Sequence, residues 1–560
     1  MALQKRDSEF RHFGVSYLDF KHVEMDRVLT GFLMRIRHKG QVSGLSRKDD
    51  IDVDLFVSEF TDPEHQEKFP GFADAPDTVA RWIETHLLDL VNRGKPNQAV
   101  AGLRPLHGMT YKFRNTHHSR PYGADAQLYE MLRHARNGRG ERALEMIERF
   151  FFTGLDPARG AAADPAIDVE TQALLHLDGQ VKQDTVRRVP GWYSTPPLCI
   201  GQADLLADDV MRLLSLEHLV PRTAMVEYLK ILFGFHLALG QLRSMKLLPH
   251  LVARGATDPV CGLNSCPADP AKRADPLAGC PFGVGLFIDA AGVPDTAIAA
   301  LSERNAQVWF GRIPAFVRAG YVVRKLNEFA DEMVRRGKQD KPKRGYFTIE
   351  EILEFGGAAW KDARELFFAT RIESILQNTP LDEQPEPVRL LLDEKTGLSS
   401  FEQYIELVMA YRADYHNSYI GESISSLLLK NRAGAVLAQP RQGRRRFIAD
   451  SRLLEVLVQI ALLRPVRSGI GYCTGSLRLD EFLDVLRTRY GLYIDRLPVG
   501  DGFASVGIDE QAALRANAEA FTARMREIGF YNDLSDAYLT QVITPRFVIA
   551  EDGSVTVGGR

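Results

Sequence analysis

Cysteine is scarce in this sequence, and its scarcity excludes one way of stabilising a fold. The chain has 560 residues and only five cysteines, an odd number. A fold that depends on disulfide bonds carries more cysteines, usually an even number, and matures outside the reducing cytoplasm. The N-terminal segment MALQKRDSEFRHFGV also lacks the apolar stretch of a signal peptide. We therefore expect a cytoplasmic protein without a disulfide framework.

A strong net charge and long apolar runs are missing as well. The formal net charge is −3 at pH 7, so any binding to nucleic acid must depend on local basic patches. The longest apolar runs, such as LLEVLVQIALL, are shorter than the roughly 20 residues that cross a bilayer. We expect no membrane contact.

Several common catalytic motifs are also absent from the sequence. It contains no G-x-x-x-x-G-K-[ST], because Gly337-Lys338 lacks both the preceding glycine and the following serine or threonine. It contains neither G-x-S-x-G nor H-E-x-x-H. Cys473 lies in the glycine-rich stretch GIGYCTGS without a histidine that the sequence would place beside it, and we interpret it as structural. These absences favour a protein without catalytic activity of its own.

The composition and the spacing of apolar residues predict a mainly α-helical, multi-domain protein. Hydrophobic residues make up 45% of the chain and charged residues 26%, which is typical of globular proteins, and the length predicts about two to four domains. We predict a small mixed α/β domain at 1–155, a central helical domain at 166–430 and a winged-helix-like domain at 450–560. The linker GLDPARGAAADP, residues 154–165, marks the first boundary.

Local patterns predict individual elements within these domains. The segment IDVDLFVSEF, residues 51–60, alternates apolar and polar residues and predicts a half-buried strand. The segment DTVARWIETHLLDLV, residues 77–91, predicts an amphipathic helix with Asp77 as its N-cap. Thr348 and Glu351 have the spacing of a capping box at the start of another helix.

The C-terminal part contains three predicted helices followed by a predicted hairpin. The helices are DSRLLEVLVQIALL, LRLDEFLDVLRTRYG and EQAALRANAEAFTARMREIG. We expect Ser476 to cap the second helix, and Gly491 and Gly529 to end the second and third. The tail from 530 to 557 is rich in β-forming residues and predicts a hairpin. This order is that of a winged-helix unit, although small helical domains that bind only protein share it.

Three of the five cysteines lie in one loop that follows a long predicted helix. The helix MVEYLKILFGFHLALGQLRSMKLLPHLV ends at Gly255, and the loop at 255–285 carries Cys261, Cys266 and Cys280 with the spacing C-x4-C-x13-C. The loop is rich in Pro, Gly, Asp and Ala, so it has little apolar surface to bury and is costly to order. Thiolates are preferred ligands of Zn²⁺. We predict that a metal ion holds the loop.

The fourth ligand of this metal is predicted to be His250, at the end of the helix, with His236 and Cys199 as alternatives. A structural zinc ion takes four nitrogen or sulfur ligands in a tetrahedron, and it is the predicted cofactor. An iron–sulfur cluster is the less favoured alternative. The spacing matches no standard zinc finger, and three cysteines without a metal in a surface loop remain the competing interpretation.

Arginines cluster next to and within the C-terminal module. The stretch NRAGAVLAQPRQGRRRF precedes the module, and further arginines lie on its third helix. Clustered arginines beside such a module neutralise phosphates and set its register on a duplex. The competing interpretation is a solvated loop and helix surface. The predicted nucleic-acid-binding residues are Arg441, Arg444, Arg445, Arg446, Arg515, Arg524 and Arg526.

A metal-dependent nuclease is the alternative enzymatic interpretation. His117 and His118 lie beside Arg120, and Asp52, Asp54 and Glu59 on the expected strand supply carboxylates for a catalytic metal. The sequence lacks a clear acid-x-Lys pair on a following strand. The competing interpretation of the histidine segment is a polar surface loop.

Two segments resemble a known group of proteins. They are TPPLCIGQADLLADDVMRLLSLEHLVPRTAMVEYLKILFGFHLALGQL and SLRLDEFLDVLRTRYGLYIDRLP. Both resemble large helical proteins of bacterial anti-phage defence islands, in particular the accessory components of methylation-associated defence systems. The resemblance implies a system of several subunits in which ATPase, kinase, methyltransferase or nuclease activity belongs to other chains.

Together these observations predict a non-catalytic DNA-binding or assembly subunit of an anti-phage defence complex. The predicted partners are DNA and other subunits of the system. A pure protein–protein scaffold is the remaining alternative.

Overall fold

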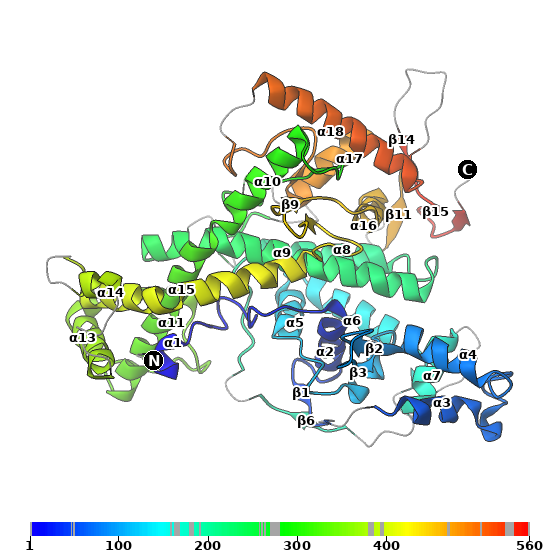
Figure 1. The fold of residues 1–560 in the computed structure, drawn as a ribbon, viewed down its shortest axis with the longest axis horizontal. Helices are drawn as coiled ribbons and strands as arrows, with labels where there is room; N and C mark the ends of the chain where they lie inside the picture. Colours follow the sequence, from blue (N-terminus) through cyan, green and yellow to red (C-terminus); the bar gives the residue numbers. More distant parts are fainter. Residues whose placement is uncertain are drawn as a thin grey trace.

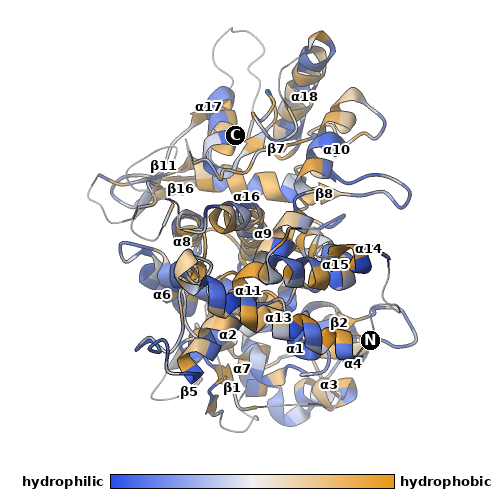
Figure 2. Cartoon of the chain, turned by 90° about the vertical axis from the view of Figure 1, so that its left-hand side faces the viewer, coloured by the Kyte–Doolittle hydropathy of each residue, from blue (hydrophilic) through white to orange (hydrophobic). Residues whose placement is uncertain are grey.

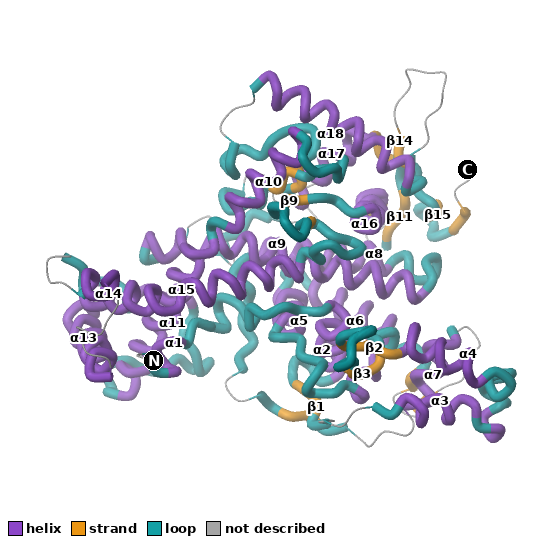
Figure 3. Tube along the Cα trace, in the orientation of Figure 1, coloured by secondary structure: helices purple, strands orange, loops and turns teal. Residues whose placement is uncertain are grey.

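The protein is mainly helical, with short two-stranded sheets between and around the helices (Figures 1 and 3). The computed structural model describes residues 3–45, 48, 51–156, 160–161, 168–178, 184–189, 192–256, 258, 261–262, 265–268, 280–378, 386–392, 397–467, 471–503, 507–531 and 542–557. This confirms the predicted helical fold class.

The centre of the molecule is the long helix α9 (Arg222–Arg254). It packs against α8 (Ile200–Leu214), α11 (Ile313–Arg335), α15 (Ser400–Leu427) and α16 (Ser451–Leu462). Gly255 ends it in the left-handed conformation, with φ +66°, as the sequence predicts. By length and composition α9 could cross a membrane, but 67% of its most apolar window is buried inside the protein. Its apolar character is therefore that of a core helix.

The N-terminal part lies below α8 and α9 in Figure 1. There α2 (Met25–Arg37) and α6 (Arg139–Phe151) pack against α5 (Ala124–His134), and α5 and α6 pack against α8. The outlying elements are α3 (Val53–Thr61), the 3-10 helix η1 (Pro63–His65), α4 (Pro76–Trp82) and α7 (Val169–Asp178). Short antiparallel pairs join β1 (Val42–Ser43) to β6 (Val186–Arg187), β2 (Leu88–Val91) to β3 (Ala99–Leu103), and β4 (Leu155–Asp156) to β5 (Gly160–Ala161).

Two predictions in the N-terminal part are wrong. The expected strand at 51–60 is helix α3, because the Asp52 side chain accepts hydrogen bonds from the backbone N–H groups of Asp54 and Leu55 and starts a helix. The expected helix at 77–91 ends as α4 at Trp82, continues as a π-helical turn and becomes strand β2. The predicted linker at 154–165 lies largely outside the described residues.

A second group of helices surrounds α11 and α15 on the left of Figure 1. It consists of α1 (Lys5–Ser8), α12 (Ile349–Glu354), α13 (Lys361–Asn378) and α14 (Glu386–Leu391). The predicted capping box is confirmed at the start of α12. The backbone N–H of Thr348 donates to the Glu351 carboxylate at 2.8 Å, and the N–H of Glu351 donates to the Thr348 hydroxyl at 3.4 Å.

The three helices predicted for the C-terminal module are present, above α9 in Figure 1. They are α16, α17 (Leu479–Val485) and α18 (Ile508–Glu527), and α18 packs against α10 (Ala297–Phe310). Gly491 and Gly529 both adopt positive φ after the second and third helices, as predicted. The expected cap Ser476 is wrong, because α17 begins after Arg478, whose N–H donates to Glu481.

Short strands complete the C-terminal part. The predicted tail hairpin is β15 (Phe547–Ile549) with β16 (Val555–Val557). Other antiparallel pairs join β8 (Leu437–Ala438) to β9 (Arg446–Phe447), β10 (Leu463–Pro465) to β11 (Tyr472–Thr474), and β12 (Leu477–Arg478) to β14 (Val542–Ile543). The pair of β7 (Leu286–Phe287) with β13 (Leu492–Tyr493) is parallel and joins the central and C-terminal segments. These extra pairings distinguish the module from three helices followed by one hairpin.

One hydrophobic core runs through all of these parts. Its buried residues extend along the sequence from Phe10 to Ile549. Figure 2 shows hydrophilic and hydrophobic residues alternating on outer helices such as α18, as expected of helices that bury one face. The predicted division into three domains stays a prediction, and the described parts share apolar packing across its boundaries.

Candidate functional site

The cysteine segment is held against the N-terminal end of α8. Cys199 is the N-cap residue of α8. The Arg136 guanidinium donates from Nη1 to the Cys266 carbonyl at 3.0 Å and from Nε to Asp204 of α8 at 2.8 Å. On the other side, Lys246 of α9 donates from Nζ to the Gly283 carbonyl at 2.7 Å. These contacts connect the middle and the C-terminal end of the predicted metal loop to α8 and α9.

The four thiols near this helix end influence one another. Burial raises the pKa of Cys199 to about 11, and the thiols of Cys280 and Cys266 add to the rise, whereas Arg243 opposes it. Burial also raises the pKa of Cys261 to about 12, with further contributions from the other three thiols. Among the described residues no three of these sulfur atoms lie within 4.8 Å of one another. A metal ion would therefore have to draw the thiols together.

The histidines predicted near the thiols differ in their availability. His250 Nε2 lies 2.9 Å from the Asp258 carboxylate, and its ring packs against Phe282. His236 is fully buried and uses both ring nitrogens, Nδ1 with Gln202 and Nε2 with Asp209. His236 therefore has no lone pair left for a metal, whereas Cys199 lies with the loop cysteines.

A buried ionic network, which the sequence analysis did not find, lies next to the thiols. Arg489, from the π-helical turn after α17, donates from Nε to Asp209 at 3.0 Å and from Nη2 to Asp208 at 2.5 Å. Gln202 bridges His236 to Arg243, whose Nε donates to the Gln202 carbonyl oxygen at 2.8 Å. Burial alone would raise the pKa of Asp209, but Arg489 and His236 outweigh it and lower the pKa to about 2. The network joins α8, α9 and the C-terminal part.

The predicted nucleic-acid-binding arginines fall into two groups, the first on the loop between β8 and β9 and at the start of β9. Arg446 is buried and lies 3.3 Å from Asp289 through Nη1, so it anchors the loop and is not free to contact phosphate. Arg445 lies over the Phe310 ring, 4.5 Å from its centroid. Arg441 and Arg444 are exposed. The anchored loop thus presents two of its four predicted arginines to solvent.

An open cleft lies between this loop and α10. Its volume is about 550 Å³. Arg444 and Arg445 line one side, and Glu303, Gln307 and Phe310 of α10 line the other. The cleft combines exposed positive charge with an aromatic wall.

The second group of predicted arginines lies on α18. Arg515 and Arg526 are exposed, and Arg526 lies 5.2 Å from the centroid of the Tyr531 ring. Arg524 is half-buried. Burial raises the pKa of Asp289, and Arg524 partly opposes this rise. Since Arg446 also binds Asp289, the two arginine groups approach each other at this acidic residue.

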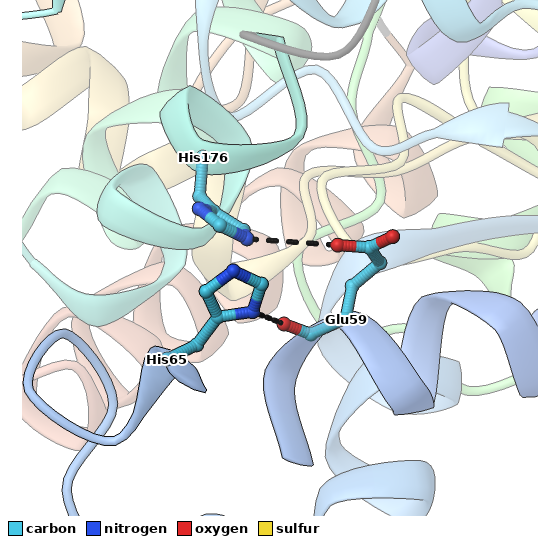
Figure 4. Close-up of side chains that lie close together, drawn as sticks. All are labelled: Glu59, His65 and His176. Carbon is cyan, nitrogen blue, oxygen red and sulfur yellow. Dashed lines mark hydrogen bonds and ion pairs between the residues drawn. The ribbon is translucent and has the colours of Figure 1, made fainter. Parts of the chain in front are cut away.

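The residues of the nuclease alternative are arranged differently from the expectation. Asp52 caps α3, and Asp54 lies in the first turn of that helix instead of on a strand. His117 is exposed, and its backbone N–H donates to the Asn115 side-chain oxygen at 2.9 Å. Glu59 instead lies beside two histidines that the sequence analysis missed, His65 and His176 (Figure 4). Their wide separation in the sequence gave no motif to detect.

The fold and these surfaces define a large helical protein with arginines around an open cleft. Residues 5–547 match the family model of methylation-associated defense system protein MAD7, so the chain belongs to this family. This confirms the resemblance to components of such defence systems. None of the curated proteins matches the chain. Membership in a defence system suggests its other components as partners.

Proposed function

We propose that the protein is a non-catalytic subunit of its defence system that binds duplex DNA through the loop between β8 and β9. The observation that carries this proposal is the anchored loop with exposed Arg441 and Arg444 beside the 550 Å³ cleft. Guanidinium groups on a fixed loop lose little freedom when they bind phosphate. The exposed Arg515 on α18 extends the basic surface.

The salt dependence of duplex binding tests this proposal. Fluorescence anisotropy with a labelled duplex, between about 50 and 200 mM salt, should give an affinity that falls steeply as salt rises. The double variant Arg441→Ala/Arg444→Ala should bind more weakly and reduce the slope of log K against log salt by about 2, because two phosphate contacts are lost. An unchanged affinity and slope in this variant would reject the proposal.

A matched control uses two other arginines. Arg335 and Arg336 are exposed at the end of α11, but both lie beside Glu332, at 2.8 and 2.7 Å. The variant Arg335→Ala/Arg336→Ala removes the same number of positive charges away from the cleft. It should bind the duplex like the unaltered protein.

The thiols are proposed to hold a structural zinc ion. The ligand set with the best support is Cys199, Cys261, Cys266 and Cys280. The other thiols help burial to raise the pKa of Cys199 and of Cys261, and His250 Nε2 is bound to Asp258. Zinc would lower these raised pKa values by stabilising the thiolates. Elemental analysis should show that Cys199→Ser and Cys261→Ser each lose about one equivalent of zinc, and a zinc content unchanged from the unaltered protein in both variants would contradict this ligand set.

We also propose that the protein is cytoplasmic and does not contact a membrane. If the duplex does not bind and the protein co-purifies with other components of the system, the scaffold alternative holds instead. Cleavage of plasmid DNA with Mg²⁺ or Mn²⁺ that Asp54→Ala abolishes would favour the nuclease alternative.

A further inference from the structure

Two histidines and a glutamate meet where α3, η1 and α7 come together, away from the thiols and the arginine cleft. Glu59 lies near the end of α3, His65 at the end of η1 and His176 on α7 (Figure 4). One ligand atom of each lies within 4.8 Å of the others. Within the described residues, these three form the group of His, Cys, Asp or Glu side chains close enough to share an ion.

A backbone contact fixes the orientation of the first imidazole. His65 Nδ1 lies 2.8 Å from the carbonyl oxygen of Glu59. A carbonyl only accepts hydrogen bonds, so Nδ1 carries the proton and Nε2 keeps its lone pair. Metal-binding histidines commonly have this arrangement, in which the second nitrogen donates to a carbonyl or carboxylate. His65 is therefore prepared to bind through Nε2.

The second imidazole presents a buried nitrogen without a hydrogen bond. The His176 side chain is 10% exposed, and its Nε2 has no hydrogen-bond partner among the described residues. The nearest carboxylate oxygen, Oε2 of Glu59, is 3.8 Å away, which is too far for a hydrogen bond. Leaving such a buried atom unpaired is energetically unfavourable. A bound ion between the two groups would remove this cost.

The surroundings favour a neutral imidazole at His176. The rings of Phe60 and Phe69 lie 5.9 and 5.4 Å from its own, and the ring of His65 lies 4.6 Å away. A neutral imidazole is the form that coordinates metals.

We propose that Glu59, His65 and His176 bind a zinc ion, with water in the fourth position. Two imidazole nitrogens and one carboxylate are a ligand set of zinc, whereas Ca²⁺ and Mg²⁺ require mostly oxygen ligands. The ion would join α3 and η1 to α7, which are far apart in the sequence, and so brace this outlying part of the molecule. The inference is independent of duplex binding and of the thiols.

Cobalt substitution of the full-length protein tests this site and separates it from the thiols. Co²⁺ bound by nitrogen and oxygen gives visible bands without the strong near-ultraviolet absorption of cobalt–thiolate bonds. The unaltered protein should show these bands and bind about one equivalent of metal at this site. His176→Gln and His65→Gln should each remove the contribution of this site to the visible spectrum, leave the cobalt–thiolate absorption unchanged, and lose about one equivalent of zinc by elemental analysis.

The control removes an imidazole elsewhere. His117 is exposed in another turn, so His117→Gln should keep the full metal content and the spectrum. Circular dichroism checks that each variant folds, and His65→Gln provides a second test at a 3-10 helix if His176→Gln unfolds α7. Equal metal content and equal visible bands in the unaltered protein and folded His65→Gln would overturn the proposal.

Discussion

Arg489 is the residue on which the buried charges of the core depend. Its side chain is 7% exposed and lies against two carboxylates, Asp208 and Asp209, that are buried as well. Charges removed from water need a partner, and losing one partner leaves the other uncompensated. The role of this residue is therefore structural, although it lies in a basic stretch, LRTRY, that looks like a helix surface.

Replacing Arg489 should destabilise the fold strongly. We expect Arg489→Met to lower the free energy of unfolding by about 3–5 kcal/mol, because Asp209 loses its cationic partner. Arg478 is a suitable control, since it is 52% exposed and pairs with exposed acids. Arg478→Met should change stability by less than about 1 kcal/mol in urea denaturation. Equal effects of the two substitutions would contradict the assigned role of Arg489.

Buried neutral histidines predict a fold that weakens in acid. Burial, with a nearby arginine in each case, lowers the pKa of His12 to about 3 and those of His107 and His416 to about 4. An unfolded histidine titrates near 6.5, so the unfolded state binds more protons between about pH 6.5 and 4. Stability is therefore present above that range and is lost as the pH falls through it.

The size of the acid effect can be measured by urea denaturation at about pH 7.5 and 5. Relative to pH 7.5, each of the three histidines should lower the free energy of unfolding by about 2 kcal/mol at pH 5, because it is protonated in the unfolded state only. Asp89 acts in the opposite direction, because burial and nearby acids raise its pKa to about 6, and it should recover about 1 kcal/mol. The unfolding free energy should fall by about 5 kcal/mol overall. An equal or higher value at the lower pH would contradict this assignment.

At the scale of elements, Gly491, which ends the π-helical turn after α17, allows two segments distant in the sequence to lie close together. Gly491 has φ +76°, and a Cβ there would lie 1.8 Å from the Val284 carbonyl oxygen. This close approach lets β13 pair with β7. Gly529 has a similar φ of +77°, but a Cβ would meet nothing within 4 Å.

These two glycines give a matched pair of substitutions. Gly529→Ala should cost about 1 kcal/mol, the cost of positive φ alone. Gly491→Ala should cost about 3 kcal/mol or more, because the backbone of β7 must also move. Thermal denaturation of both variants measures the difference. A smaller loss for Gly491→Ala than for Gly529→Ala would contradict the contact.

Elements with local signals could be predicted from the sequence, and those decided by tertiary contacts could not. Helix α9 and the capping box of Thr348 were predictable from apolar spacing and cap residues. The alternation in 51–60 suggested a strand, but the Asp52 cap and the burial of Phe56 and Phe60, four residues apart on one helix face, decided for α3. In residues 51–60, the helix cap and the packing of the two phenylalanines outweighed the alternating pattern.

The candidate sites follow the same division. The arginine run was visible in the sequence, whereas the buried position of Arg446 depends on Asp289, which lies far away in the chain. Glu59 was considered as a metal ligand together with His117 or His118, whereas the structure places it beside His65 and His176. His65 and His176 come together only because α7 packs against the N-terminal helices.

At the scale of the whole molecule, α9 connects three groups of helices to one continuous core. The N-terminal part carries the proposed zinc site, the centre carries the thiols and the buried ions, and the C-terminal part carries the arginine cleft. Membership in a defence system suggests that its other components are partners of this chain. Because protein interiors are closely packed, strain at one surface can reach the packing near the others through the shared core.

Hydrogen–deuterium exchange with and without duplex DNA tests the central claim, that the loop between β8 and β9 is the binding surface. Duplex should slow exchange in the loop residues 439–445 and in the adjoining end of α10. Arg441→Ala/Arg444→Ala should remove that protection. Slowed exchange confined to other segments, or none at saturating duplex, would contradict the account.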